Sequence, residues 1–446
     1  MHCGRKGPKR GRCWHREKAL TTKVIEITKK RRRVLLSVIS LYFVVDLYLC
    51  SRLPSIVYPM TPRQRLVTAL QGGRPDRLPA TTHHVMQYYL DKYEGGISSQ
   101  TFFERYGLDP IIWPVLHKPA PASGDYFDPL QGPPGFLEAR RVWSDHWRVQ
   151  AEDIPGAVQK ITRYRFVTPK GTLSMVTESN DQTTWVTEHL VKSKRDIDLI
   201  GEFMTSPWCD VEGVNQVAEA YGERGLVRSH IPCFDVFGQP GTWQDACCLY
   251  PTEQLILATY DDPAWVHAFL RILHRRKKTY IQSMAGGKFD LLELGGGSAS
   301  STVISPRLFE EFVAPYDTEL ISLAHQAGQR IVYHTCGGMM PILEKVAAMQ
   351  PEAMETFTPP AMGGDVDLAA AKRRIGDRVC MIGGFDQFHS LIGCTPEATR
   401  AAVRQCFEAA GAGGGYILSP SDHFFDADPE LIQAYAEEAR QCVYPT

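Results

Sequence analysis

The sequence has no excess of charge of either sign. Its 49 lysines and arginines are matched by 50 aspartates and glutamates, which gives a formal net charge of −1. A chain with this balance lacks the broad positive field by which basic domains bind nucleic acid or anionic membranes. We therefore expect no nucleic-acid partner, and no membrane partner for residues 60–446.

The chain also lacks the compact cysteine framework of small secreted proteins. Its 12 cysteines are scattered from Cys3 to Cys442. Such spacing indicates reduced cysteines, most of them small core residues such as Cys247 and Cys248, in a cytoplasmic protein.

Residues 1–59 do not conform to the rest of the chain. They contain a basic run ending at Arg33, followed by an uncharged run, Val34 to Val45, that is too short to span a bilayer. Three interpretations stay open: a wrongly extended reading frame with Met60 as the true start, a membrane anchor, or a cleaved signal. The first is favoured because Thr61 and Pro62 suit the N-cap and the first position of a helix.

From Met60 onward, strand-like apolar runs alternate with amphipathic helical runs. This alternation is typical of a parallel sheet with crossover helices, and α/β barrels often use this many residues as one domain. We therefore predict one (β/α)8 barrel over residues 60–446. Its expected strands are Leu78–Val85, Pro110–Val115, Gly225–Ile231, Asp290–Leu294, Arg330–Cys336, Glu352–Phe357, Val379–Gly384 and Tyr416–Pro420.

One segment breaks the alternation. Residues 140–193 contain four strand-like runs separated by turn residues, with a tight turn at Pro169-Lys-Gly171. This pattern predicts an antiparallel elaboration inserted between early barrel strands.

Active sites of such barrels form at the carboxyl ends of the strands. His334-Thr335-Cys336 is the sharpest feature at these ends. Residues i and i+2 of a strand point the same way, so the imidazole and the thiolate can converge on one ion, and nitrogen and sulfur together favour Zn²⁺. The last strand delivers Asp422 and His423 to the same rim, and either could complete the site.

Other polar residues near the strand ends are candidates for substrate contacts or chemistry. Glu293 precedes a glycine run and is a candidate acid–base group, a metal ligand or a partner of the turn. Asp386 is a candidate catalytic residue that could equally orient a loop. His83, His84 and Tyr333 are candidate substrate contacts, and strand alternation predicts that at most one of the two adjacent histidines points inward.

Six motifs, in order along the chain, resemble the uroporphyrinogen decarboxylase superfamily, and most closely its cobalamin-dependent methyltransferase branch. They are MTPRQRLVTALQGGRPDRLP at 60–79, TPKGTL at 168–173, ISPRLFEEFVAPY at 304–316, YHTCGGMMPILE at 333–344, GGFDQ at 383–387 and YILSPSDH at 416–423. The resemblance implies a barrel fold for roughly residues 60–443.

The resemblance implies two possible chemistries. The decarboxylases of the superfamily use an arginine-bearing loop near the N-terminus and no metal, and the stretch ATTHHVMQYYL after Pro79 lacks that loop. The methyltransferases bind zinc through H-x-C and a distant cysteine. His334 and Cys336 match the first two ligands, whereas Ser421-Asp422-His423 stands where the distant cysteine is expected.

The leading hypothesis is a zinc-dependent methyltransferase. It would act on a small methyl donor or acceptor together with methylcobalamin carried by a separate corrinoid protein, because this chain has no D-x-H-x-x-G signature. The alternatives are metal-free decarboxylation of uroporphyrinogen or a related carboxylated substrate, and a non-catalytic binding barrel.

Overall fold

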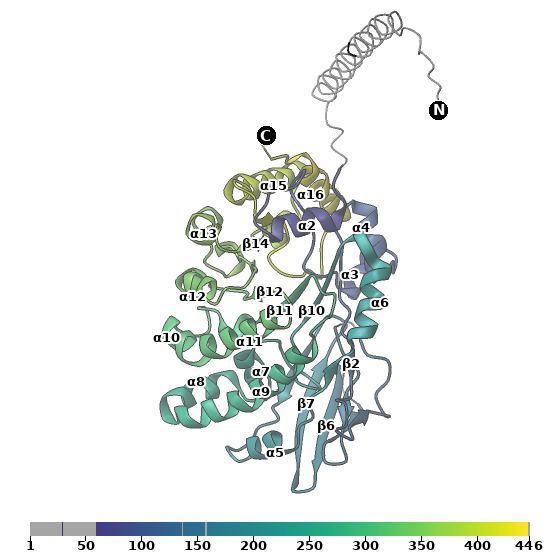
Figure 1. Ribbon diagram of the computed structural model, residues 1–446, viewed down its shortest axis with the longest axis vertical. Coiled ribbons are helices and arrows are strands. Elements are labelled where there is room, and N and C mark those ends of the chain that lie inside the picture. The colour runs from purple at the N-terminus through teal and green to yellow at the C-terminus, as the bar shows by residue number, and fades with distance from the viewer. Residues whose placement is uncertain (1–28, 30–58, 136, 157, 445–446) are drawn as a thin grey trace, which may run out of the picture. The chain divides into compact units, whose positions relative to one another are not determined.

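The structure is a computed structural model that describes Lys29 and residues 59–135, 137–156 and 158–444. The chain divides into two units, Met1–Pro59 and Met60–Thr446, and the labelled helices and strands of Figure 1 belong to the second. The predictions made for the basic and apolar runs of the first unit lie outside the described residues. In the part of the chain that is described, none of the helices combines the length and the apolar character needed to cross a bilayer.

Seven parallel strands form the central sheet, so the predicted α/β alternation is confirmed. Their order is β1-β10-β11-β12-β13-β14-β15, and each neighbouring pair is parallel. The strands are shorter than the predicted runs: β1 Ile111–Ile112, β10 Leu226–His230, β11 Leu291–Gly295, β12 Ile331–His334, β13 Ala353–Thr356, β14 Cys380–Gly383 and β15 Tyr416–Ile417.

A short extended segment contacts both edges of this sheet. Ala80, within the predicted strand Leu78–Val85, forms a parallel bridge with Leu418, just after β15. On its other side, the Ala80 carbonyl accepts a hydrogen bond of 2.7 Å from the N–H of Asp109, just before β1. The segment is thus a one-residue bridge rather than a full strand, and it lies between the two edge strands.

Helices flank the sheet, and the helix start predicted at Thr61 and Pro62 is confirmed. Thr61 caps α2 (Pro62–Leu70) in a capping box with Gln64, and Thr395 and Asp428 cap α15 (Pro396–Ala410) and α16 (Pro429–Gln441). The helical stretch that follows Ser305 is interrupted by a π-helical turn: α10 Pro306–Leu308, η3 Phe309–Val313, α11 Ala314–Gln326.

The remaining helices lie mostly along the two sides of the sheet (Figure 1). They are α3 Gln87–Tyr93, α4 Ser99–Tyr106, α5 Asp196–Phe203, α6 Val211–Tyr221, α7 Thr242–Leu249, α8 Thr252–Asp261, α9 Pro263–Ser283, α12 Leu343–Ala348, α13 Leu368–Ile375 and α14 Gln387–Ser390, with short 3-10 turns η1 Gly222–Arg224, η2 Gly297–Ala299, η4 Met340–Ile342 and η5 Pro360–Met362.

The paired strands predicted between residues 140 and 193 are confirmed as a four-stranded antiparallel sheet in the order β5-β6-β7-β8. It lies at the opposite end of the view from α15 and α16 (Figure 1). Its strands are β5 Arg148–Ile154, β6 Lys160–Thr168, β7 Gly171–Ser179 and β8 Thr184–Glu188, and two small strand pairs accompany it: β2 His117–Lys118 with β9 Trp208–Cys209, and β3 Tyr126–Phe127 with β4 Val142–Trp143.

One apolar cluster joins all seven parallel strands. Each strand contributes at least one buried side chain to it, and α2 adds Leu66, Ala69 and Leu70. The strand residues are Ile111, Leu226, Leu291, Val332, Ala353, Cys380, Ile382 and Ile417. Because side chains from every strand meet in one cluster, the parallel sheet curls around it, and α2 covers the cluster.

A buried carboxylate fixes the short segment between the sheet edges. Asp109 is fully buried and accepts hydrogen bonds from the guanidinium of Arg65 on α2 and from the N–H of Ala80. Arg77 lies 3.3 Å from the same carboxylate. Asp109 therefore connects α2 and the Ala80 segment to the start of β1.

We expect Asp109→Ala to lower the free energy of unfolding by about 3 kcal/mol, because it leaves a buried guanidinium without one of its carboxylates. Chemical denaturation followed by circular dichroism measures this. The matched control is Glu202→Gln, which breaks the exposed Lys170–Glu202 pair and is expected to cost less than about 1 kcal/mol. Equal losses in the two variants would contradict the structural role of Asp109.

Candidate metal centre

The inward faces of the parallel strands change from apolar to polar along the chain direction. Leu226, Leu291, Val332 and Ala353 belong to the apolar cluster. Two residues further along the same strands, and therefore on the same face, stand Arg228, Glu293, His334 and Glu355. The strand register brings His334 directly opposite Glu355. The sheet thus collects its charged side chains towards the carboxyl ends of the strands.

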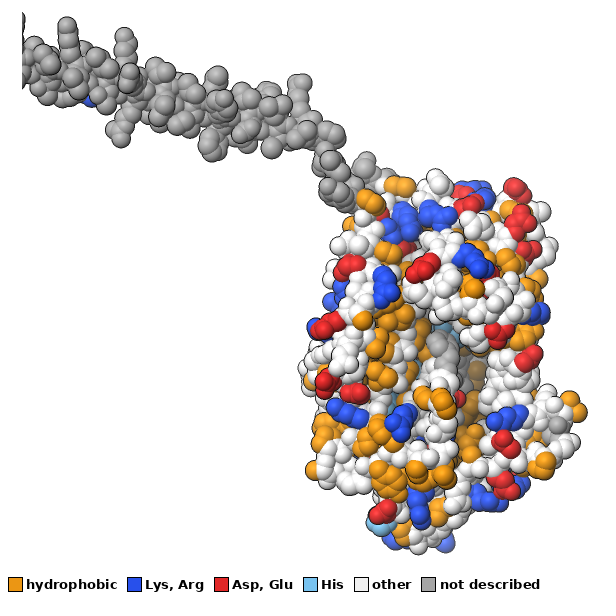
Figure 2. All heavy atoms as spheres, turned by 90° about the vertical axis from the view of Figure 1, so that its right-hand side faces the viewer, with side chains coloured by type: hydrophobic (Ala, Val, Ile, Leu, Met, Phe, Trp, Pro, Cys, Tyr) orange, Lys and Arg blue, Asp and Glu red, His pale blue; other side chains and the backbone are white. Residues whose placement is uncertain are grey.

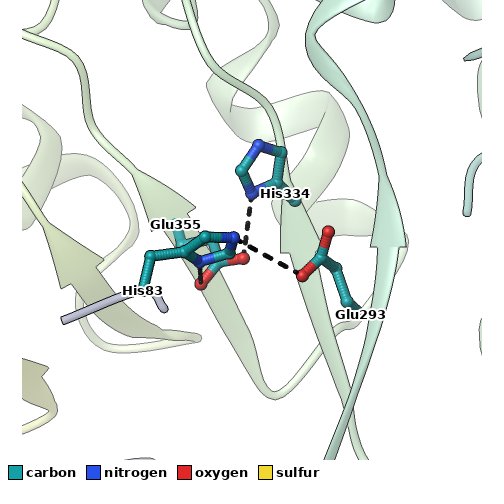
Figure 3. A group of neighbouring side chains, drawn as sticks. All are labelled: His83, Glu293, His334 and Glu355. Atoms are coloured by element: carbon teal, nitrogen blue, oxygen red, sulfur yellow. Dashed lines mark hydrogen bonds and ion pairs between the residues drawn. The ribbon is translucent and has the colours of Figure 1, made fainter. Parts of the chain in front are cut away.

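Four side chains form one buried group: His83, Glu293, His334 and Glu355 have nitrogen or oxygen atoms that all lie within 4.8 Å of one another. His334 Nδ1 is 3.0 Å from Glu355 Oε1, and the two nitrogens of His83 lie 3.5 Å from Glu355 and 3.8 Å from Glu293. Figure 3 shows the ring of His83 between the two carboxylates.

The charge of the two glutamates is balanced by Arg228 on β10. Its guanidinium donates a hydrogen bond of 2.7 Å to Glu293 and bonds both carboxylate oxygens of Glu355. It also stacks over the ring of Trp113, 4.4 Å from the ring centroid. Burial of Glu355 opposes its charged form, but Arg228 and His83 hold its pKa well below the usual range. Glu355 is therefore a carboxylate although it is fully buried.

His334 belongs to a second group with Cys336 and Asp422. One ligand atom of each residue lies within 4.8 Å of those of the other two. Because Nδ1 of His334 faces Glu355, its second ring nitrogen is the atom that remains for another partner, and Figure 3 shows that nitrogen pointing away from the first group. Burial opposes protonation of this ring, but hydrogen bonds to Cys336 and Glu355 raise its pKa well above the usual value.

Glycines leave the space that the sulfur of Cys336 occupies. A Cβ atom on Gly297 would lie 2.5 Å from Cys336 Sγ, which is inside van der Waals contact. Gly337, directly after Cys336, has a φ of 99°, a conformation that other residues rarely adopt. The chain therefore turns tightly directly after the H-x-C sequence.

Asp422 and His423, the two candidate ligands that follow the last strand, lie close together, but only Asp422 belongs to a group of candidate ligands in the described part of the chain. Asp422 belongs to the group with His334 and Cys336, whereas His423 is in neither group found among the described residues. His423 Nδ1 lies 2.9 Å from the carboxylate of Asp422, and its ring stacks on His84 with centroids 5.0 Å apart. Burial opposes the charge on Asp422, but His423 holds its pKa well below the usual value.

Both groups open onto one cavity of about 1400 Å³. His334, Cys336 and Asp422 contribute to its wall on one side, and residues of the loop 130–142 and of the antiparallel sheet line it elsewhere. The sheet contributes Ala151, Asp153, Lys160, Thr162, Tyr164, Thr177, Ser179 and Thr184. The face seen in Figure 2 is hollowed, with hydrophobic side chains along the sides of the hollow.

His83 and His84 both line this cavity, so the expectation that only one of them points inward is wrong. The physical reason is local. The chain bends at His83, beyond the bridge at Ala80, so the alternation of a regular strand does not apply there. Their rings lie 4.6 Å apart.

Two other candidates lie elsewhere. The hydroxyl of Tyr333 donates to Asp317 on α11, 2.9 Å away, and its side chain is fully buried in the core. Asp386 caps α14 and lies 2.9 Å from the ring of His389. The structure therefore does not bring Tyr333 or Asp386 into either group, and their roles in substrate binding and catalysis stay predictions.

Sequence reasoning missed Arg228 and Trp113 as parts of the site. A charged residue in the middle of the buried run Leu226–His230 was the available signal for Arg228, since a buried arginine requires an anionic partner. Glu355 stood at a predicted strand end, but nothing in the sequence indicated that it contacts His334.

A solved structure of a methyltransferase from Methanosarcina mazei is similar in fold. It superposes with a TM-score of 0.54 over 86% of this chain and 99% of that chain, at 14% sequence identity. At this identity the similarity concerns the fold, an α/β architecture around a curled parallel sheet.

Sequence comparisons show a similarity in the C-terminal half of the chain. Residues 236–442 match the family model of uroporphyrinogen decarboxylase (URO-D). Curated uroporphyrinogen decarboxylases from Thioalkalivibrio sulfidiphilus and Pseudomonas paraeruginosa are 26% and 28% identical over 190 residues, which is 41% of this chain and 50% of each relative. The chain thus spans about half the length of the curated relatives it matches. The matched residues include His334, Cys336 and Asp422, so over residues 236–442 the chain is similar to the uroporphyrinogen decarboxylase family.

Proposed function

We propose that the protein is a zinc-dependent methyltransferase that acts with a separate corrinoid protein. The observation that carries the proposal is the convergence of His334, Cys336 and Asp422, whose ligand atoms lie within 4.8 Å of one another at the wall of a large cavity. Nitrogen, sulfur and oxygen donors together suit Zn²⁺, and three protein ligands leave one position open, as in catalytic zinc sites.

The partners of these three residues support the same assignment. A histidine that binds a metal usually donates its other ring N–H to a carboxylate, which fixes the tautomer and the ring orientation. Glu355 has this relation to Nδ1 of His334. The other imidazole nitrogen would give up its proton when a metal binds and would then serve as the ligand.

In this proposal zinc, when bound, acts as a Lewis acid that favours the thiolate form of a thiol substrate. The residues of the chain bind and orient that substrate. His83 and His84 face the cavity beside the ligands, and Glu293, held by Arg228, is placed to exchange a proton with the substrate. The cavity accommodates a small methyl donor or acceptor, and the methylcobalamin would be carried by the partner protein.

We further propose that residues 60–446 form one complete (β/α)8 barrel domain, with the Ala80 segment as the short eighth strand. The hydrogen bonds from this segment to both edges of the parallel sheet support it. The antiparallel sheet would then be an insertion after the second barrel strand, because β5 to β8 lie in sequence between β1 and β10.

Decarboxylation of a carboxylated substrate without metal is the second candidate, favoured by the names of the curated relatives. Such a substrate requires free positive charge in the cavity. The arginines along the cavity are instead largely engaged: Arg141 pairs with Asp128, and Arg276 with Asp235. This distribution of charge favours the methyltransferase.

Metal analysis of the purified protein tests the zinc site directly. We expect about one zinc per chain, and loss of most of it in His334→Ala, Cys336→Ser and Asp422→Asn, since each removes one of three ligands. Cys394→Ser is the matched cysteine control, and His423→Ala should retain zinc because its ring faces Asp422. Full zinc content in the Cys336→Ser variant would contradict the assignment of Cys336 as a zinc ligand.

Glu355→Gln tests the orientation of His334. We expect it to bind zinc about 10- to 100-fold more weakly, the usual effect of losing the carboxylate behind a histidine ligand. Competition with a chromophoric chelator measures the affinity. Because Arg228 also loses a charged partner, circular dichroism must first show that the variant folds; a folded variant with unchanged affinity contradicts the proposed role of Glu355.

The reaction class is tested with two substrates. We expect the zinc-loaded protein to accelerate methyl transfer between methylcobalamin and a thiol, seen as a change in the visible spectrum of the corrinoid, and the Cys336→Ser variant to lose this acceleration. Uroporphyrinogen should not be decarboxylated. Turnover of uroporphyrinogen by protein stripped of metal would establish the second candidate instead.

A further inference from the structure

A second cysteine lines the cavity apart from the proposed zinc ligands. Cys233 follows β10, and His230, the last residue of that strand, lies beside it. Cys233 is free and half-buried, whereas most cysteines of the described residues, such as Cys247 and Cys380, are buried. Its sulfur lies 3.6 Å from Nδ1 of His230. The backbone carbonyl of Cys233 accepts a hydrogen bond from Arg276, which fixes its position.

The surroundings of His230 require a proton on both ring nitrogens. Nδ1 lies 2.9 Å from the carbonyl oxygen of Ile231, and Nε2 lies 3.1 Å from the carbonyl oxygen of Leu137. A carbonyl oxygen only accepts hydrogen bonds, so each nitrogen must donate, and a ring that donates from both nitrogens is an imidazolium. Burial opposes this charge, but Cys233 and the two carbonyls raise the pKa of His230 to about 9.

A positive ring next to a cysteine favours the thiolate, which is the nucleophilic form of the side chain. The pair differs from the proposed zinc site, because His334 has a carboxylate at Nδ1 while His230 has only carbonyl oxygens and the sulfur. The charge of the imidazolium is therefore available to the sulfur of Cys233 rather than to an acidic residue.

We propose that Cys233 and His230 form a second nucleophilic site in the cavity, which reacts with soft carbon electrophiles independently of zinc. The sulfur of Cys233 donates an electron pair to the carbon of the electrophile and forms an S–C bond. The bond from that carbon to the leaving group breaks, and the leaving group departs with its electron pair. Cys233 becomes a neutral thioether, and its new substituent occupies the cavity that His334 and Cys336 share.

Iodoacetamide is the probe that tests this site on the full chain. Peptides from a time course of alkylation near neutral pH are quantified by mass spectrometry, with iodide as the leaving group. We expect Cys233 to react at least about tenfold faster than Cys394, because only Cys233 has a positively charged ring beside its sulfur. Cys394 is the matched control: it is also half-buried, and its sulfur faces the Ser390 carbonyl and the Thr399 hydroxyl.

His230→Gln separates the effect of the imidazolium from that of exposure. We expect this variant to slow alkylation of Cys233 about tenfold and to leave Cys394 unchanged. If the variant does not fold, the ratio of the two alkylation rates in the natural protein, measured at one pH near neutrality, still tests the proposal. Equal rates at the two cysteines, or an unchanged rate at Cys233 in folded His230→Gln, overturns the proposal.

Discussion

The guanidinium of Arg228 lies fully buried between Glu293 of β11 and Glu355 of β13, and the arrangement of the site depends on it. Glu293 and Glu355 point into the same space, and without a compensating cation two buried carboxylates could not both remain charged. By keeping Glu355 ionised, Arg228 also keeps it as an acceptor for Nδ1 of His334. One positive charge thus fixes, through Glu355, which nitrogen of His334 faces the cavity.

The ion pairs of Arg228 with Glu293 and Glu355 also explain why the inward face of the curled sheet can carry charged side chains towards the carboxyl ends of its strands. The inward face of each strand starts with an aliphatic or small side chain, and these pack with α2 into a dry cluster. On β10, β11, β12 and β13 the same face carries a charged or ionisable side chain two residues later. Burying the charges is tolerable there because they pair across strands, and because the cavity gives Glu293 and His334 partial access to solvent. The apolar cluster that stabilises the sheet and the charged residues of the site therefore lie at opposite ends of the same strands.

The parts of the fold and site that sequence could predict are those set by local periodicity. The alternation of helices and strands, the cap at Thr61, and the shared direction of His334 and Cys336 all follow from neighbours within a few residues. The link from Arg228 to Glu355 spans 127 residues and depends on strand register, which no local pattern encodes. The position of His84 was misjudged for the opposite reason, since a bend replaced the regular strand that the pattern assumed.

The location of the family match bears on which reaction the cavity can host. Residues 236–442 carry His334, Cys336 and Asp422, so the similarity to decarboxylases concerns the half of the chain that holds the proposed ligands. The opposite wall of the cavity comes from the loop 130–142 and from β5 to β8, which lie outside the matched range. Substrate selection depends on that wall, because it faces whatever is held beside the ligands. The names of the curated relatives are therefore a weak guide to the substrate of this chain. The three proposed ligands, His334, Cys336 and Asp422, carry more weight in assigning the chemistry.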